Sequence, residues 1–217
     1  MNTLDMININ REYDRLQLIY GDPTLHSVYG GGCCKSPKVM LVFMNPTKRN
    51  IASCKSWEGI RAFGIGTKNV WNLIYTLGFI DKEVYDLIKV KKGRDWSEEF
   101  ARLVYENVRK NEVYITNLAK CTQSDARALN DAVFKNYLEL FYQEISLVNP
   151  QKIILFGNQV SSIFLEKSIS VSKNRKVLHK KVINNKEYDC YAVYYPVGNG
   201  FFNIDKAIED IKYILIN

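Results

Sequence analysis

The 217-residue sequence contains no long apolar run and nothing that resembles an export signal. Its first eight residues form neither a basic stretch nor an extended apolar one. No later window approaches the roughly 18 apolar residues of a membrane-spanning helix. We therefore expect a soluble, cytoplasmic protein that has no membrane partner.

Cysteine is sparse, and its spacing lacks the pattern of a structural framework. No two cysteines form a CxxC pair, and an odd number of them does not suit the disulfide framework of a small secreted protein. The five cysteines are Cys33, Cys34, Cys54, Cys121 and Cys190. We expect them to be reduced thiols.

Acidic residues are fewer than basic ones, 23 against 30, which gives a formal charge of +7. This surplus favours a polyanionic partner because each phosphate contact releases counterions, although many basic proteins bind no nucleic acid. Hydrophobic residues at 47% and charged residues at 24% are ordinary globular values. Since the composition does not shift along the chain, we expect one domain over residues 1–217, with residues 1–27 as a peripheral N-terminal segment.

The apolar segment Val39–Phe43 is too short for a membrane span and fits a strand buried on both faces. Asn45 and Pro46 follow almost at once, and Pro46 removes a backbone donor and biases Asn45 toward an extended conformation. The strand therefore delivers a polar amide at the carboxyl edge of a sheet, where open α/β folds bind their ligands. An ordinary Asn-Pro turn is the alternative interpretation.

Two further segments resemble Val39–Phe43, because each is a short, mainly apolar strand with a predicted helix after it. Residues 112–116 form a second predicted strand that runs into Asn117, and residues 152–156 form a third that ends at Gly157. Strands that alternate with helices indicate a three-layer α/β/α fold with a mostly parallel central sheet. Helices are expected at residues 9–20, 68–77, 131–148 and from Ile204 onward, with a charged helical insert at residues 81–111.

Turn signals define the remaining segments. Gly30–Gly32 predicts a flexible lead into the first core strand. Asn184–Lys186 predicts the turn of a hairpin whose second strand covers residues 188–195. The segment before this hairpin, residues 173–181, concentrates positive charge.

The order of five segments is similar to that in the uracil-DNA glycosylase superfamily. The segments are Phe43–Thr47, Phe63–Gly66, Tyr114–Cys121, Asn149–Gly157 and Tyr195–Pro196. The resemblance covers roughly residues 28–202, and its third and fourth segments look most like the iron–sulfur branch, family 4. It implies a base-excision enzyme that cleaves the N-glycosidic bond of uracil, or of a related deaminated base, flipped out of DNA.

The resemblance also implies roles for single residues. Asn45 matches the family's water-positioning asparagine, and Tyr195 occupies the place of its histidine. Phe63 falls where the family stacks an aromatic ring on the base, and Asn117 falls where an asparagine reads the base edge, with Met44 completing the base-binding set. The expected DNA-binding residues are Lys48, Arg49, Lys120, Asn199, Phe201 and Phe202, the last three from the loop that enters the minor groove in the family.

General physical chemistry suits these roles. A flipped base needs an apolar slab on its face and a donor and acceptor pair on its edge, which a phenylalanine and an asparagine supply. An asparagine holds a water molecule but cannot take its proton, and a tyrosine donates a hydrogen bond without a positive charge. We therefore expect an enzyme that is slower than relatives with a carboxylate and a histidine.

The sequence departs from the family pattern in its metal ligands and in its first motif. Thr47 stands where that motif ends in glycine or tyrosine. Of the four cysteines that hold the cluster in the iron–sulfur branch, only Cys121 falls at a matching position, and Tyr137 replaces another. We therefore expect a monomer with no metal and no cofactor.

Two other functions remain open. One is a glycosylase-fold protein that binds nucleic acid or a nucleobase without catalysis, and the other is a small-molecule α/β enzyme that uses the same strand-edge pocket. Asn45 and Asn117 are alternatively turn or cap residues, Phe63 is alternatively a core residue, and Tyr195 alternatively bonds only to a loop. Phe201 and Phe202 are alternatively core residues.

Overall fold

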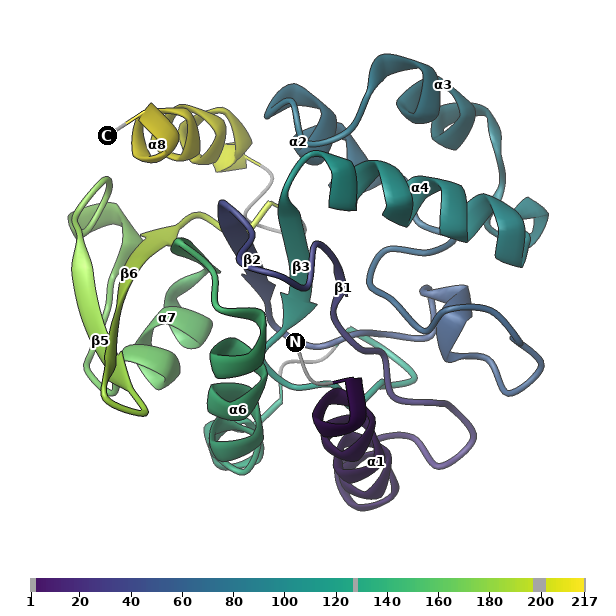
Figure 1. Cartoon of the computed structure of the whole chain (residues 1–217), viewed down its shortest axis with the longest axis horizontal. Coiled ribbons are helices and arrows are strands. Elements are labelled where there is room, and N and C mark those ends of the chain that lie inside the picture. Colours follow the sequence, from purple (N-terminus) through teal and green to yellow (C-terminus); the bar gives the residue numbers. More distant parts are fainter. Residues whose placement is uncertain (1–2, 127–128, 197–201, 217) are drawn as a thin grey trace.

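A six-stranded sheet forms the centre of the protein in the computed structural model (Figure 1). The structure describes residues 3–126, 129–196 and 202–216. The strands are β1 (Gly31–Gly32), β2 (Val39–Phe43), β3 (Val113–Asn117), β4 (Lys152–Phe156), β5 (His179–Ile183) and β6 (Lys186–Val193). Their order is β1-β3-β2-β4-β6-β5, with β3, β2, β4 and β6 parallel and the two edge strands antiparallel. The predicted α/β fold with a mostly parallel sheet is confirmed.

Helices cover both faces of the sheet (Figure 1). One layer contains α1 (Thr3–Tyr20), α5 (Asp131–Lys135), α6 (Leu138–Val148) and α7 (Asn158–Leu165). The other contains α2 (Asn69–Thr76), α3 (Lys82–Val90), α4 (Glu98–Lys110) and α8 (Ile204–Ile216). Short 3-10 helices, η1 (Ile51–Ser53), η2 (Gly93–Asp95) and η3 (Val171–Lys173), lie in the connections. None of the helices that the structure describes has both the length and the apolar character of a membrane span.

Strand β2 determines where the loops of the sheet's carboxyl edge lie. Its five residues are buried, with Leu41 packed into one helical layer and Met40 and Val42 into the other. Phe43, its last residue, is aligned with Asn117 of β3. The loops that follow β2 and β3 therefore leave the sheet side by side.

The glycines before β2 do not form the expected flexible lead. Gly31 and Gly32 form β1, which pairs with β3. A Cβ atom on Gly30 would lie 2.2 Å from the Tyr114 hydroxyl, and one on Gly31 would lie 2.6 Å from the Tyr105 ring. The glycines therefore serve close packing against two tyrosines, a contact between distant segments that a local turn signal does not reveal.

The helix expected over residues 131–148 is divided into α5 and α6. Asn136 follows α5, and its side-chain Nδ2 donates to the Ala132 carbonyl at 3.0 Å. The next residue, Tyr137, is fully buried and stacks on Tyr13 of α1, with ring centroids 6.0 Å apart. The division therefore lets the Tyr137 ring enter the core between α1 and α6.

Other local signals behave as predicted. Segment 81–111 holds α3, η2 and α4, and Ser97 caps α4 by accepting a hydrogen bond from the Phe100 amide at 3.2 Å. The hairpin turns at Asn184 and Asn185, whose φ angles are 47° and 63°. Strand β6 ends two residues before Tyr195, so this tyrosine lies in the following loop.

Candidate functional site

Aromatic rings from two strand ends and two loops meet at the carboxyl edge of the sheet. Phe43 stacks between Phe63 and Phe156, with centroid distances of 4.5 and 4.3 Å and interplanar angles of 14° and 10°. Tyr195 meets the edge of Phe43 at 6.3 Å and 77°. Phe43 and Phe156 are fully buried, whereas Phe63 and Tyr195 are partly exposed. Two of the expected site residues, Phe63 and Tyr195, thus lie against one buried ring.

Asn117 lies beside this aromatic cluster, since it pairs with Phe43 across β2 and β3. Its side chain is 0% exposed, yet neither Oδ1 nor Nδ2 has a hydrogen-bond partner among the residues that the structure describes. Burying an amide without partners costs about 1–3 kcal/mol by protein mutational data. Native proteins rarely keep such a group without a functional reason, and a ligand that bonds both atoms is one such reason. The turn or cap alternative does not apply to this side chain.

Asn45 follows Phe43 by two residues and is partly buried. Its Nδ2 donates to the carbonyl of Pro46 at 3.2 Å, and its Oδ1 has no partner in the described part of the chain. Met44 packs its side chain into the layer of α1 and α6, and its carbonyl accepts a hydrogen bond from Ala119 N at 3.1 Å. The base contact expected for Met44 stays a prediction.

The Tyr195 hydroxyl lies close to the end of β2. Burial raises the pKa of this phenol to about 12, and a hydrogen bond with the Met44 backbone acts in the opposite direction. A Cβ atom on Gly157, the residue after β4, would lie 3.5 Å from the Cβ of Tyr195. Tyr195 is therefore a neutral phenol near pH 7, held over the ends of β2 and β4, and it can donate a hydrogen bond.

The family model described as the uracil DNA glycosylase superfamily matches residues 30–198. The chain belongs to this superfamily. No single curated protein matches the chain. Membership supports a function of the uracil-DNA glycosylase kind, with DNA as the substrate. The matched span includes Asn45, Phe63, Asn117 and Tyr195 and leaves α1 and α8 outside it.

The expectation that Lys120 binds DNA is wrong. Its side chain is 0% exposed, and its Nζ lies 2.8 Å from Oε2 of Glu144, which is also buried. A lysine enclosed in this way cannot reach a phosphate. No local signal indicates this burial, because the partner is 24 residues further on, in α6.

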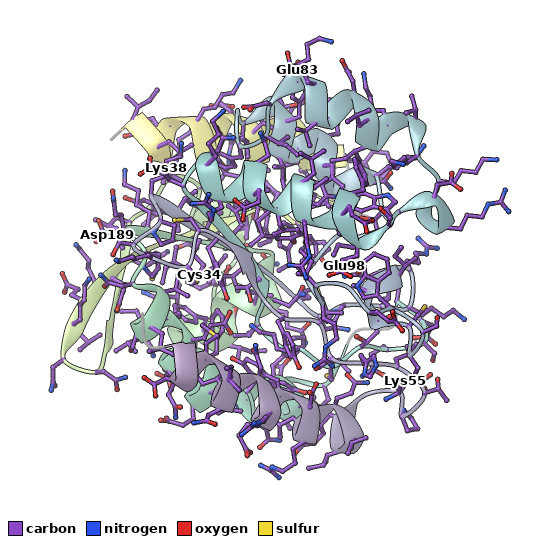
Figure 2. All side chains as sticks on the ribbon, turned by 45° about the vertical axis from the view of Figure 1, so that its right-hand side comes forward. Cys34, Lys38, Lys55, Glu83, Glu98 and Asp189 are labelled. Carbon is purple, nitrogen blue, oxygen red and sulfur yellow. The ribbon has the colours of Figure 1, made fainter. Side chains whose placement is uncertain are left out.

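Other basic residues within the matched residues 30–198 are accessible to DNA. Lys48, Arg49 and Lys55 are exposed, and none of them forms an ion pair with a residue that the structure describes. Lys55 extends from the surface in Figure 2. By contrast, the basic segment 173–181 is largely neutralised by acidic partners. Its ion pairs are Arg175–Asp210, Lys176–Glu209, Lys180–Asp189 and Lys181–Glu166.

The loop after Tyr195 carries three of the expected DNA contacts. Asn199 and Phe201 lie outside the described residues. Phe202, at the start of the chain that leads into α8, is 89% exposed. Phe202 is thus not a core residue, and its contact with DNA stays a prediction.

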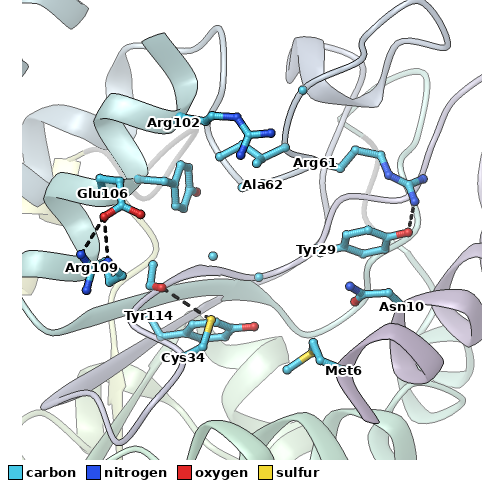
Figure 3. A pocket seen from close by; sticks show the side chains of 16 residues that line it. Met6, Asn10, Tyr29, Cys34, Arg61, Ala62, Arg102, Glu106, Arg109 and Tyr114 are labelled. Carbon is cyan, nitrogen blue, oxygen red and sulfur yellow. Dashed lines mark hydrogen bonds and ion pairs between the residues drawn. The ribbon is translucent and has the colours of Figure 1, made fainter. Parts of the chain in front are cut away.

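A separate cleft of about 550 Å³ lies at the β1 edge of the sheet, between α1 and α4 (Figure 3). Each of its three arginines is already engaged, Arg102 with Glu98 at 2.8 Å. Arg61 makes two 2.9 Å hydrogen bonds to Asp14, and Arg109 bonds Glu106 at 2.8 Å. None of the residues expected to bind the base or the water lines this cleft, so it is not the candidate site.

Sequence reasoning missed Phe43 and Phe156 as the base of the aromatic cluster. A signal was present, because each is the last residue of a predicted parallel strand, with Asn45 two residues after Phe43 and Gly157 directly after Phe156. Neighbouring parallel strands in register bring such terminal residues together, and here Val42 aligns with Leu155.

Proposed function

We propose that the protein is a DNA glycosylase that hydrolyses the N-glycosidic bond of uracil, or of a related deaminated base, in DNA. The observation that carries this proposal is the buried, unpartnered amide of Asn117 beside the Phe43 aromatic cluster. Uracil presents a donor at N3–H and an acceptor at O4, and a carboxamide offers the matching acceptor and donor. A uracil bonded to Asn117 would satisfy both buried atoms.

In the proposed mechanism, neutral groups act on both sides of the bond that breaks. Oδ1 of Asn45 accepts a hydrogen bond from water and orients its oxygen toward the sugar C1′. The C1′–N1 bond breaks and its electron pair leaves with the base. As the new C1′–O bond forms, the proton lost from the water passes through solvent to the anionic base. The Tyr195 phenol donates a hydrogen bond to the departing anionic base, which lowers the barrier because negative charge develops there.

We further propose that the protein is a family 4-like member with an asparagine in its first motif and without an iron–sulfur cluster. The residues present do not fit a cluster. No group of three or more histidine, cysteine or acidic residues in the described part of the chain is arranged to hold a metal. Cys121 is buried, which raises the pKa of its thiol, and its Sγ accepts a hydrogen bond from Gln123 Nε2 at 3.8 Å. No step of the proposed reaction uses a metal.

The decisive experiment incubates the protein with oligonucleotides that contain a single uracil, hypoxanthine or xanthine and measures release of the free base. Release from at least one of them, with none from a thymine-containing control, supports the proposal. Absence of release together with retained DNA binding favours the second candidate, a glycosylase-fold protein that only binds. The absence of a carboxylate or a histidine from the aromatic cluster is the observation that favours this candidate. Loss of DNA binding as well favours a small-molecule enzyme.

Removing the Phe63 ring is expected to weaken binding of uracil-containing DNA. Base stacking on an aromatic side chain contributes about 1–3 kcal/mol, so Phe63→Ala should lower affinity roughly 5- to 150-fold. Fluorescence anisotropy with a uracil oligonucleotide measures this effect. Phe156→Leu is the matched control, because Phe156 stacks on the other side of Phe43 and is fully buried. Equal losses in both variants would mean that Phe63 acts only as a core residue.

We propose that Lys48 and Arg49 bind DNA phosphates in a monomeric, cytoplasmic protein. Each phosphate contact contributes about 0.9 to the slope of log K against log salt, so Lys48→Gln/Arg49→Gln should make the slope shallower by about 1.8. The control variant is Lys180→Gln/Lys181→Gln, whose cations already have acidic partners. An unchanged slope in the first variant would remove these two residues from the interface.

A further inference from the structure

A closed network of charges and hydroxyls lies beneath the end of β3. Lys120 Nζ contacts Glu144 Oε2 at 2.8 Å, donates to Thr116 Oγ1 at 2.7 Å and also donates to the main-chain carbonyl of Asn117. An ammonium group has three hydrogens, so all of its donors are used. The side chains of Lys120 and Glu144 are 0% and 1% exposed. Water therefore does not take part in holding this charge pair.

The carboxylate of Glu144 is as fully bonded as the ammonium group. Its Oε1 accepts from Tyr114 at 3.0 Å and from Thr116 at 2.8 Å, and its Oε2 accepts from Tyr13 at 2.7 Å in addition to Lys120. Four donors occupy the four acceptor positions of a carboxylate. These donors come from α1, β3 and the loop after β3, so the network ties three segments to α6.

Stability alone does not explain this network. Well-packed apolar residues in place of a buried ion pair are often as stable or more stable, because removing two charges from water is costly. What apolar residues cannot do is donate to the Asn117 carbonyl. That carbonyl belongs to the peptide group at which the chain leaves β3, and Leu118 N already bonds back to Phe43 O at 2.8 Å. Both bonds engage the same peptide group, the one between Asn117 and Leu118, so they hold the main chain at the point from which the Asn117 side chain projects.

The same residue combines a main-chain carbonyl that is bonded to Lys120 with a carboxamide that has no partner among the described residues. A carboxamide with no protein partner can rotate about its last side-chain torsion, so that its oxygen and its nitrogen exchange positions. The ability of Asn117 to discriminate between bases therefore depends on how firmly its main chain is held. Every other polar group in the network is paired, which leaves the Asn117 amide as the group that is open to a ligand.

We propose that the Lys120–Glu144 pair is a positioning device that holds Asn117 in place to discriminate uracil from cytosine. This inference rests on the proposed glycosylase function. The test variant is Lys120→Met/Glu144→Gln, which removes both charges and the bond to the Asn117 carbonyl but keeps an amide acceptor for the hydroxyls of Tyr114 and Thr116. The matched control is Thr116→Val, which removes a hydroxyl from the same network but keeps the bond from Lys120 to Asn117.

Two measurements are made on both variants. The first is the ratio of kcat/KM for uracil to that for cytosine in otherwise identical oligonucleotides. We expect the ratio to fall about tenfold or more in the double variant, mainly through kcat for uracil, and to stay unchanged in Thr116→Val. The second is the position of the Asn117 amide signals in protein labelled with ¹⁵N-asparagine, assigned by their loss in Asn117→Leu. We expect these signals to shift or broaden in the double variant alone.

The outcomes separate this inference from the proposed function. Absence of base release by the wild-type protein contradicts the function, and the asparagine signals then decide whether the pair positions Asn117. Unchanged signals and an unchanged ratio in a folded double variant overturn the inference, as does an equal change in Thr116→Val. If the double variant does not fold, Lys120→Met provides the same measurements, because the Glu144 carboxyl can take up a proton in the absence of its partner.

Discussion

Asn117→Leu is expected to unfold at a higher temperature than the wild-type protein and to release uracil at least about 100-fold more slowly. Both effects have one cause. The amide is fully buried and has no partner among the described residues. An apolar side chain of similar shape therefore removes an unmet desolvation cost of about 1 kcal/mol. For a chain of this length, that gain corresponds to a rise in Tm of about 2–4 °C. The same change removes the donor and acceptor that the base edge requires. Thermal unfolding and base release together measure the two effects.

The direction of the stability change is the critical part of this result. A residue that serves the core destabilises the protein when it is replaced, whereas a binding residue held at a cost to stability does the opposite. Asn117→Asp provides the complement, because a carboxyl group inverts the pattern on the edge and should relax selectivity toward cytosine. Lower stability in Asn117→Leu, or unchanged base preference in Asn117→Asp, would remove Asn117 from recognition.

The strands and their polar ends could be predicted because the signals are local. Val39–Phe43 and residues 153–156 are uninterrupted apolar runs, and the parallel sheet brings their carboxyl ends to one edge. Asn45 follows the first of these runs, and Asn117 follows the predicted strand 112–116. The pairing of Asn117 with Phe43 depends on β2 and β3 being neighbours, an order that alternation with helices does not by itself predict.

The features that could not be predicted depend on contacts between distant segments. The Gly31–Gly32 strand exists because glycine admits the tyrosine rings of β3 and α4, and Lys120 is buried because Glu144 meets it from α6. In sequence, a lysine after a strand resembles a solvated loop residue, and a glutamate in a helix resembles an exposed one. Only the packing of α6 on the sheet shows that Lys120 and Glu144 are buried rather than exposed.

The candidate site is built from groups that carry no charge at neutral pH. Asn45 and Asn117 are amides, and burial keeps Tyr195 protonated. The nearest charge pair, Lys120 with Glu144, is closed on itself and presents only a hydrogen bond to the Asn117 main chain. In the proposed reaction, transition-state charge would therefore be stabilised by oriented dipoles, which act strongly where water is excluded. On the leaving-group side, the dipole that we propose is the phenol of Tyr195.

Tyr195→Phe is expected to lower kcat for uracil release about 100-fold with little change in KM, because the lost hydrogen bond forms only as the base leaves. The active form of the phenol is protonated, so its contribution is present at low pH and is lost as pH rises through its pKa of about 12. Wild-type activity should therefore not fall near pH 10, where an ordinary tyrosine ionises. The rate of free-base release, measured between about pH 7 and 11, tests this prediction.

Tyr195→His is the informative companion variant. An imidazole titrates between about pH 5 and 8, so this variant should gain a dependence on pH in that range that the wild-type protein lacks. Its charged form should be the faster one, because an imidazolium places positive charge beside the anionic base. A Tyr195→Phe protein as fast as wild type would assign leaving-group stabilisation to another residue, and the phenol would then serve only to pack against Phe43 and Gly157.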